Sequence, residues 1–167
     1  MMDALMRQGH EVIAVGKISD IFAGRGVTRS TGVNENNADG MEKTLRIQQE
    51  DFTGLCFVNL VDFDMTYGHR RDIAGYARAT TEFDVQLGTF MEHMREDDVL
   101  MITADHGCDP GAPGTDHTRE YVPLLVYGAQ IRKGVNLGTY PTFAMIGATV
   151  ADMFGTGLTT KGESLLP

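Results

Sequence analysis

The 167-residue sequence predicts an α/β fold with a mostly parallel sheet and flanking helices. Short apolar segments rich in branched residues alternate with longer segments in which apolar residues recur every three or four positions. The short segments are almost continuously apolar, which is typical of strands buried on both faces of a parallel sheet. The length is sufficient for one ordinary domain with a hydrophobic core.

The expected elements follow in order along the chain. Residues 2–9 read as the end of a helix, and a helical turn is expected at 19–22. Further helices are predicted over 37–49, capped by Asn37 or Asp39, over about 72–95, capped by Asp72, and over 142–155, closed by Gly155. Strands are predicted at 11–15, 53–63, 99–104 and 121–128.

Composition narrows the classes of function. The net charge of −9 argues against nucleic acid as a partner, because phosphate repels an acidic chain. No apolar run reaches the roughly 18 residues of a membrane span, so no membrane association is expected. Cys56 and Cys108 are too few for a disulfide framework, and two free thiols fit a reducing cytoplasm. The acid excess serves either solubility or a cation site.

Ionisable side chains gather where two of the predicted strands end. In open α/β sheets, functional residues lie just beyond the carboxyl ends of the strands. Such groups are costly after a buried strand unless they are paired or bind a metal. The first strand end is followed by Asp62, Asp64 and His69, the second by Asp105 and His106, and the loop beyond by Asp109, Asp116 and His117.

Mixed carboxylate and imidazole ligands fit Zn²⁺, Mn²⁺ or Fe²⁺ better than Ca²⁺ or Mg²⁺. There are more candidate ligands than one open catalytic ion needs, which predicts two ions about 3.5–4 Å apart around a phosphoryl group. Each residue taken alone has a simpler explanation, since a single His after a strand is commonly structural and a single Asp is commonly a helix cap. Asp62 fits a cap, a supporting group or a ligand equally well.

Three motifs together resemble the phosphopentomutases of the alkaline phosphatase superfamily. They are DFDMTYGHRRD at 62–72, TADHGCDP at 103–110 and GTDHTRE at 114–120, and the upstream segment VIAVGKISDIFAGRGVT is similar as well. The resemblance extends from about Glu11 to Gly162. It implies an alkaline-phosphatase-like core and an isomerase that interconverts the 1-phosphate and 5-phosphate of ribose or deoxyribose. It also implies two divalent metal ions, Mn²⁺ in the first place and Zn²⁺ as the alternative.

The resemblance assigns metal ligands residue by residue. Asp64, His69 and His117 would hold one ion, and Asp105 and His106 would hold the second. Family members complete the second site with another Asp and a phosphorylated Thr nucleophile, both in the N-terminal half of the core. No counterpart of either is found in this sequence. Residues 1–167 are therefore expected to be the C-terminal portion of the core domain, without the N-terminal core part and the cap domain.

This expectation has consequences for activity and association. Without the nucleophile there is no covalent relay, so the chain alone is predicted to be inactive as a mutase. Apolar surface left uncovered predicts self-association. Lys17, just after the 11–15 strand, is a candidate contact for the substrate phosphate or else a solvated loop lysine.

Two other functions stay open. One is a different enzyme of the superfamily, such as a cofactor-independent phosphoglycerate mutase, which shares the TADHG element but lacks the HRRD run. The other is a metal-binding domain without catalysis.

Overall fold

The computed structural model describes residues 1–158 and 160–166, which form a mixed α/β arrangement. The chain divides into two compact units. The first comprises Met1–Val33, Glu50–Asn59 and Asn136–Pro167, and the second comprises Asn34–Gln49 and Leu60–Val135.

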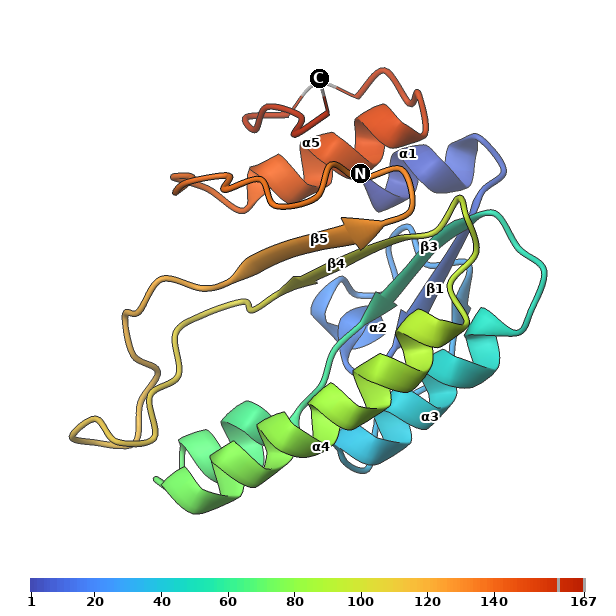
Figure 1. The fold of residues 1–167 in the computed structure, drawn as a ribbon. Helices are drawn as coiled ribbons and strands as arrows, with labels where there is room; N and C mark the ends of the chain where they lie inside the picture. The colour runs from blue at the N-terminus through green and yellow to red at the C-terminus, as the bar shows by residue number, and fades with distance from the viewer. Residues whose placement is uncertain (159, 167) are drawn as a thin grey trace. The chain divides into compact units, whose positions relative to one another are not determined.

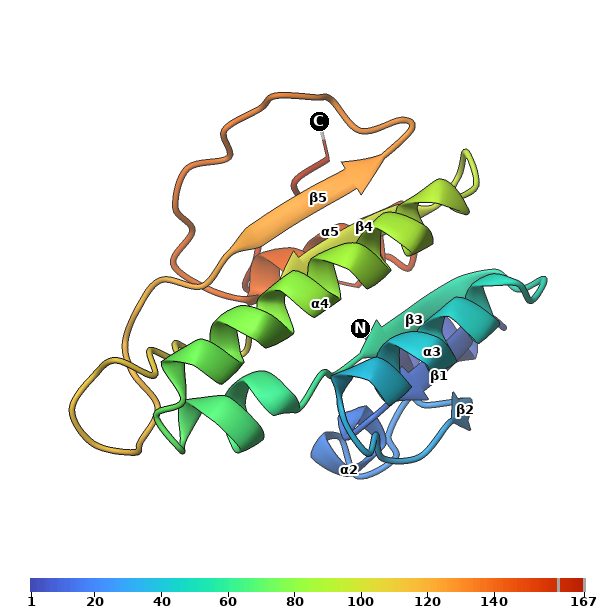
Figure 2. The same ribbon diagram turned by 60° about the horizontal axis from the view of Figure 1, so that its bottom comes forward.

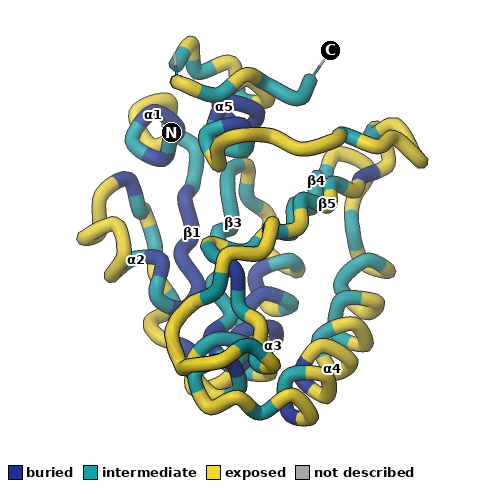
Figure 3. The backbone as a smooth tube through the Cα atoms, turned by 90° about the vertical axis from the view of Figure 1, so that its left-hand side faces the viewer, coloured by how far each residue is buried: buried dark blue, intermediate teal, exposed yellow. Residues whose placement is uncertain are grey.

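The first unit is built around a three-stranded parallel sheet. Its strands are β1 (Glu11–Val15), β2 (Arg29–Ser30) and β3 (Gly54–Val58), in the order β2-β1-β3 (Figure 1). The central strand β1 holds the core, because Val12 to Val15 have no exposed surface (Figure 3). The prediction of a parallel sheet with flanking helices is confirmed here.

Three helices complete the first unit: α1 (Met2–Arg7), α2 (Ile18–Ile21) and α5 (Ala144–Met153). The predicted helices at 2–9, 19–22 and 142–155 are thereby confirmed within a few residues. Gly155 follows the end of α5 with a φ of +58°, which favours glycine, so its predicted role in closing the helix is also confirmed. The C-terminal ends of α1 and α5 lie close together, because the rings of His10 and Phe154, which follow these helices, are 4.8 Å apart.

The second unit contains the helices α3 (Asn37–Gln48) and α4 (Ile73–Glu92), the π-helix η1 (Phe63–Gly68) and the strands β4 (Val99–Thr103) and β5 (Leu124–Gly128). Helices α3 and α4 pack against each other, and α4 packs against η1 (Figure 2). Asp72 caps α4 as predicted, since its Oδ1 accepts a hydrogen bond of 2.8 Å from the backbone of Gly75.

Strands β4 and β5 form an antiparallel pair, in which Met101 faces Val126. The antiparallel direction follows from the loop between them, which turns the chain back on itself. The strand predicted over 121–128 begins only at Leu124, because Pro123 has no N–H to donate. The prediction of a mostly parallel arrangement is confirmed by the first unit, and this pair is its antiparallel exception.

Two other predicted boundaries are wrong. The strand predicted over 53–63 ends at Val58, since the chain turns into η1 before the apolar run is over. The cap of α3 is Asn36, whose side chain accepts a hydrogen bond of 2.9 Å from the backbone N–H of Asp39. Asp39 instead binds Lys43 at 2.7 Å, and this bond lowers the pKa of its carboxyl group.

Both cysteines are free thiols, as expected. Burial in β3 raises the pKa of Cys56 to about 12, so this thiol stays protonated and inert at neutral pH. Among residues 1–158 and 160–166, no helix combines the length and the apolar character that crossing a membrane requires.

Candidate metal centre

The predicted ligands Asp64 and His69 are brought together by the π-helix η1. The backbone N–H of His69 donates to the carbonyl of Asp64 at 3.0 Å, a hydrogen bond that spans five residues. In an α-helix, residues five apart point about 140° away from each other, because each residue turns the helix by about 100°. The wider π turn brings the two side chains to the same face, so the Asp-x4-His spacing has a direct structural meaning.

Two further predicted ligands, His106 and His117, lie on the two arms of the long loop between β4 and β5. An isolated antiparallel bridge joins Gly107 to Thr118, with a hydrogen bond of 3.1 Å from the N–H of Thr118 to the carbonyl of Gly107. Only glycine fits on the first arm, since a Cβ at position 107 would lie 2.6 Å from the carbonyl oxygen of Thr118. The bridge stacks the rings of the preceding residues, His106 and His117, at 3.7 Å and 18°.

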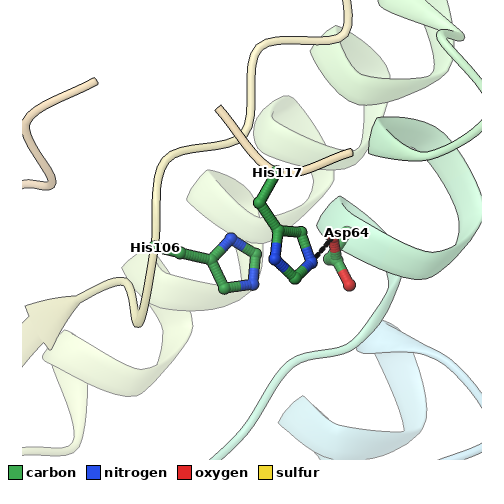
Figure 4. Close-up of side chains that lie close together, drawn as sticks. All are labelled: Asp64, His106 and His117. Carbon is green, nitrogen blue, oxygen red and sulfur yellow. Dashed lines mark ion pairs between the residues drawn. The ribbon is translucent and has the colours of Figure 1, made fainter. Parts of the chain in front are cut away.

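One carboxylate oxygen lies at the centre of this arrangement. Asp64 Oδ1 is 3.2 Å from Nε2 of His69 and 3.3 Å from Nε2 of His117. Side-chain ligand atoms of Asp64, His106 and His117 all lie within 4.8 Å of one another (Figure 4). Within the described part of the chain, Asp64 Oδ1 is buried and has no hydrogen-bond partner. A buried carboxylate oxygen of this kind is costly unless a cation lies beside it.

The hydrogen bonds of the histidines leave the inward nitrogens free for a metal. Nδ1 of His69 contacts the backbone carbonyl of Thr115, and Nδ1 of His106 lies 3.0 Å from the carbonyl of Gly107. A carbonyl oxygen only accepts, so both Nδ1 atoms carry a proton, and in the neutral imidazoles both Nε2 atoms present a lone pair. Metal-binding histidines are oriented in this way. Two acceptors facing each other, Asp64 Oδ1 and His69 Nε2, are stabilised by a cation between them, so the residues fit a divalent ion.

The surroundings are electrostatically negative. The pKa of Cys108, next to the loop bridge, is raised first by burial and then by the charges of Asp64, Glu120, Asp109 and Asp105. Burial, and then the negative charges that Cys108 and Asp64 carry when they are ionised, also raise the pKa of Tyr76. A field that opposes further negative charge favours a bound cation.

The five predicted ligands therefore lie in one unit of the structure, but in unequal positions. Asp64 Oδ1 lies beside His69 and His117, which were predicted to share the first ion with it. The cluster within 4.8 Å, however, joins Asp64 and His117 to His106, which was predicted for the second ion. His106 stacks on His117, and its Nε2 is 3.6 Å from Oδ1 of Asp105, whose side chain is 72% exposed. The division into two ion sites stays a prediction.

Asp62 and Lys17 have other neighbours. The carboxylate of Asp62 binds the backbone of Asn37 and the hydroxyl of Thr66, which is the supporting role among the three left open by the sequence. Lys17 is the N-cap of α2 and belongs to the first unit, whereas the metal cluster belongs to the second. Its contact with a substrate phosphate stays a prediction.

Several residues that shape the site were not predicted from the sequence to do so. The hydroxyl of Thr118 accepts from the backbone of Asp109 at 2.7 Å and donates to Glu120, which ties the two loop arms together. Thr115 orients His69 through its backbone carbonyl, a group that every residue type has. Thr115, Thr118 and Glu120 all lie within the GTDHTRE motif, but the motif indicates neither the backbone contact nor the hydroxyl bonds.

Comparison with known proteins shows that the chain is similar to part of several curated phosphopentomutases. It is 57% identical over 166 residues to a phosphopentomutase of Lachnoclostridium phytofermentans, covering 99% of this chain and 42% of that protein. It is 58% identical over 155 residues to a phosphopentomutase of Carboxydothermus hydrogenoformans, covering 93% of this chain and 40% of that protein. The chain thus spans about two fifths of the length of these curated relatives.

A solved structure shows the same fold. The PH0037 protein from Pyrococcus horikoshii superposes with a TM-score of 0.63 at 19% identity, over 93% of this chain and 52% of that one. A family model described as the metalloenzyme superfamily matches residues 5–158. Because this match spans nearly the whole chain and includes the entire carboxylate and imidazole cluster, we conclude that the chain belongs to the metalloenzyme superfamily.

Proposed function

We propose that this chain is the C-terminal, metal-holding portion of a phosphopentomutase core domain. The observation that carries the proposal is the 57% identity to a phosphopentomutase over 99% of the chain. The cluster around Asp64 supports it, because the residues that meet there are those that the motifs assign to metal binding. The reaction is the interconversion of ribose or deoxyribose 1-phosphate and 5-phosphate, an isomerisation by phosphoryl transfer.

The proposed cofactors are two divalent ions, Mn²⁺ before Zn²⁺. Asp64, His69 and His117 hold one ion, and Asp105 with His106 supplies part of the second site. When bound, such ions neutralise the charge of the phosphoryl group and help to position it for transfer. The chain's own contribution is to orient the ligands: the carbonyls of Thr115 and Gly107 keep the proton of each imidazole on Nδ1, so that Nε2 faces the site.

The remaining assignments are part of the same proposal. The partner is a pentose phosphate, with Lys17 contacting its phosphate, and neither nucleic acid nor membrane is involved. The location is the cytoplasm. Residues 1–167 alone are inactive as a mutase, since no residue here matches the nucleophile motif of the family.

A chimera tests the function directly. In it, this chain replaces the matching 42% of the Lachnoclostridium phytofermentans phosphopentomutase. We expect the chimera to convert ribose 5-phosphate in the presence of Mn²⁺, and we expect the isolated chain not to do so. The readout is the phosphate position, followed by NMR, with 3-phosphoglycerate as a second substrate.

Three results would contradict parts of the proposal. Turnover by the isolated chain would show that the predicted inactivity is wrong. A chimera that rearranges phosphoglycerate but not pentose phosphate would favour another enzyme of the superfamily. A folded, metal-loaded chimera that acts on neither substrate would favour a metal-binding domain without catalysis.

The isolated chain is also expected to self-associate. Apolar side chains are exposed on the second unit, among them Tyr121 (88%), Val85 (68%) and Leu125 (59%). Exposed apolar side chains on and beside a strand favour association between molecules. Sedimentation velocity should show a mass that grows with concentration, and Leu125→Ser should reduce it. A monomer at every concentration tested would contradict this expectation.

A further inference from the structure

Asp62 and Asn37 are joined by two reciprocal hydrogen bonds. The backbone N–H of Asn37 donates to Asp62 Oδ2 at 2.6 Å, and the backbone N–H of Asp62 donates to Asn37 Oδ1 at 2.9 Å. Asn37 is the first residue of α3 and is only 7% exposed. The two residues are 25 positions apart, so this pair connects the start of α3 to the start of η1.

The second oxygen of the same carboxylate acts inside η1. Asp62 Oδ1 accepts a hydrogen bond of 2.9 Å from the hydroxyl of Thr66. The side chain makes no capping bond to the helix that it precedes. One carboxylate thus connects the start of η1 to α3, through Asn37, and to a residue within η1 itself, through Thr66.

The π turn needs such support because its geometry is rare and replaces the commoner α-helical hydrogen bonds. Relaxation of the segment to an α-helix would break the bond between the N–H of His69 and the carbonyl of Asp64, and would turn the two side chains apart. Asp64 is the second residue of η1, two positions beyond Asp62. The hydrogen bonds of Asp62 therefore hold the backbone next to Asp64, on whose orientation the metal cluster depends.

We propose that Asp62 is a positioning residue for metal binding, which acts through Asp64 and His69 by holding η1 in its π conformation. Asn37 and Thr66 are its two anchors. The inference rests on the proposed metal site, and it adds to that site a residue that contacts no ion. Its carboxylate accepts two hydrogen bonds and its backbone N–H donates a third, so its role differs from that of the ligands around it.

The test measures Mn²⁺ affinity by isothermal titration and the ligand geometry by the visible spectrum of bound Co²⁺. Asp62→Ala removes all of the carboxylate's bonds. Asp62→Asn keeps the shape, with its oxygen accepting from Asn37 and its amide donating to the Thr66 hydroxyl. Asn36→Ala is the matched control, because it removes the cap of α3 one residue away without touching η1.

We expect Asp62→Ala to weaken Mn²⁺ binding by about 10- to 100-fold and to change the Co²⁺ spectrum, as removal of a residue that orients ligands does. Asp62→Asn should restore most of the affinity, and Asn36→Ala should lower the melting temperature but leave affinity and spectrum unchanged. If Asp62→Ala does not fold, Thr66→Val, which deletes only an exposed hydroxyl, should still weaken binding.

Two outcomes would overturn the inference while leaving the metal site intact. One is wild-type affinity and spectrum in both Asp62→Ala and Thr66→Val. The other is an equal loss of affinity in Asn36→Ala, which would assign the effect to the general stability of α3. A wild-type chain that binds neither Mn²⁺ nor Co²⁺ would instead refute the metal site itself, and the positioning role with it.

Discussion

Replacing Asp64 with asparagine is expected to abolish tight binding of a divalent ion and, at the same time, to stabilise the metal-free chain. Oδ1 of Asp64 faces Nε2 of both His69 and His117 at 3.2 and 3.3 Å, so no other atom contributes as much to the cluster. Loss of this ligand should weaken Mn²⁺ binding by at least about 100-fold, since residues that only orient ligands already contribute 10- to 100-fold.

The opposite effect on the metal-free chain follows from the same geometry. The buried Oδ1 of Asp64, which has no hydrogen-bond partner in the described structure, lies opposite the Nε2 lone pair of neutral His69. The amide of asparagine can donate to that lone pair, which should raise the free energy of unfolding by about 1 to 3 kcal/mol. Urea denaturation with EDTA and with Mn²⁺ measures both effects, because an ion that binds only the folded state stabilises it.

Asp84→Asn provides the control for this experiment. It makes the same chemical change on an exposed position of α4 and should alter neither metal affinity nor stability. An Asp64→Asn variant that is stabilised by Mn²⁺ as strongly as the wild type would show that Asp64 is not a ligand.

Replacing Gly68 with alanine is expected to destabilise the second unit and to weaken metal binding. Gly68 is the last residue of η1, and a Cβ there would lie 2.2 Å from Sγ of Cys108 and 2.9 Å from the carbonyl oxygen of Phe63. Overpacking of this kind costs about 1 to 3 kcal/mol. Because Cys108 follows His106 by two residues, the added methyl group would push the loop arm away from η1, and the ligands on each side would separate.

The contact can be isolated with a double-mutant cycle. Cys108→Ala removes Sγ, so it should recover part of the stability lost in Gly68→Ala, although the contact with Phe63 remains. Gly88→Ala is the matched control. It lies inside α4 with no atom within 4 Å of its added Cβ, and it should gain about 0.5 to 1 kcal/mol from the better helix propensity of alanine. Equal stabilities of Gly68→Ala and Gly88→Ala in thermal denaturation would contradict the close approach.

Much of the fold was predictable because local patterns and tertiary packing agree. The run Val12–Val15 reads as a buried strand and is the most buried part of the first unit. Asp72 was predicted to cap a helix and does so. Its carboxylate accepts a hydrogen bond from the N–H three residues later, and this local bond does not depend on how the helix packs. The failures lie at boundaries. The apolar run after β3 continues beyond Val58, and nothing in its composition distinguishes a strand residue from a buried turn residue.

For the candidate site too, part was predictable from the sequence and part depends on the tertiary structure. The sequence determined which residues are chemically able to bind a metal, because only a few side chains carry the lone pairs and charge required, and the motifs identify them in one superfamily. Only the tertiary structure decided how they meet. A π turn, and not an α-helix, places Asp64 beside His69, and a single backbone bridge stacks His106 on His117. Both depend on hydrogen bonds to backbone groups and to residues far away in the chain, such as Asn37, which have no signature in the local sequence.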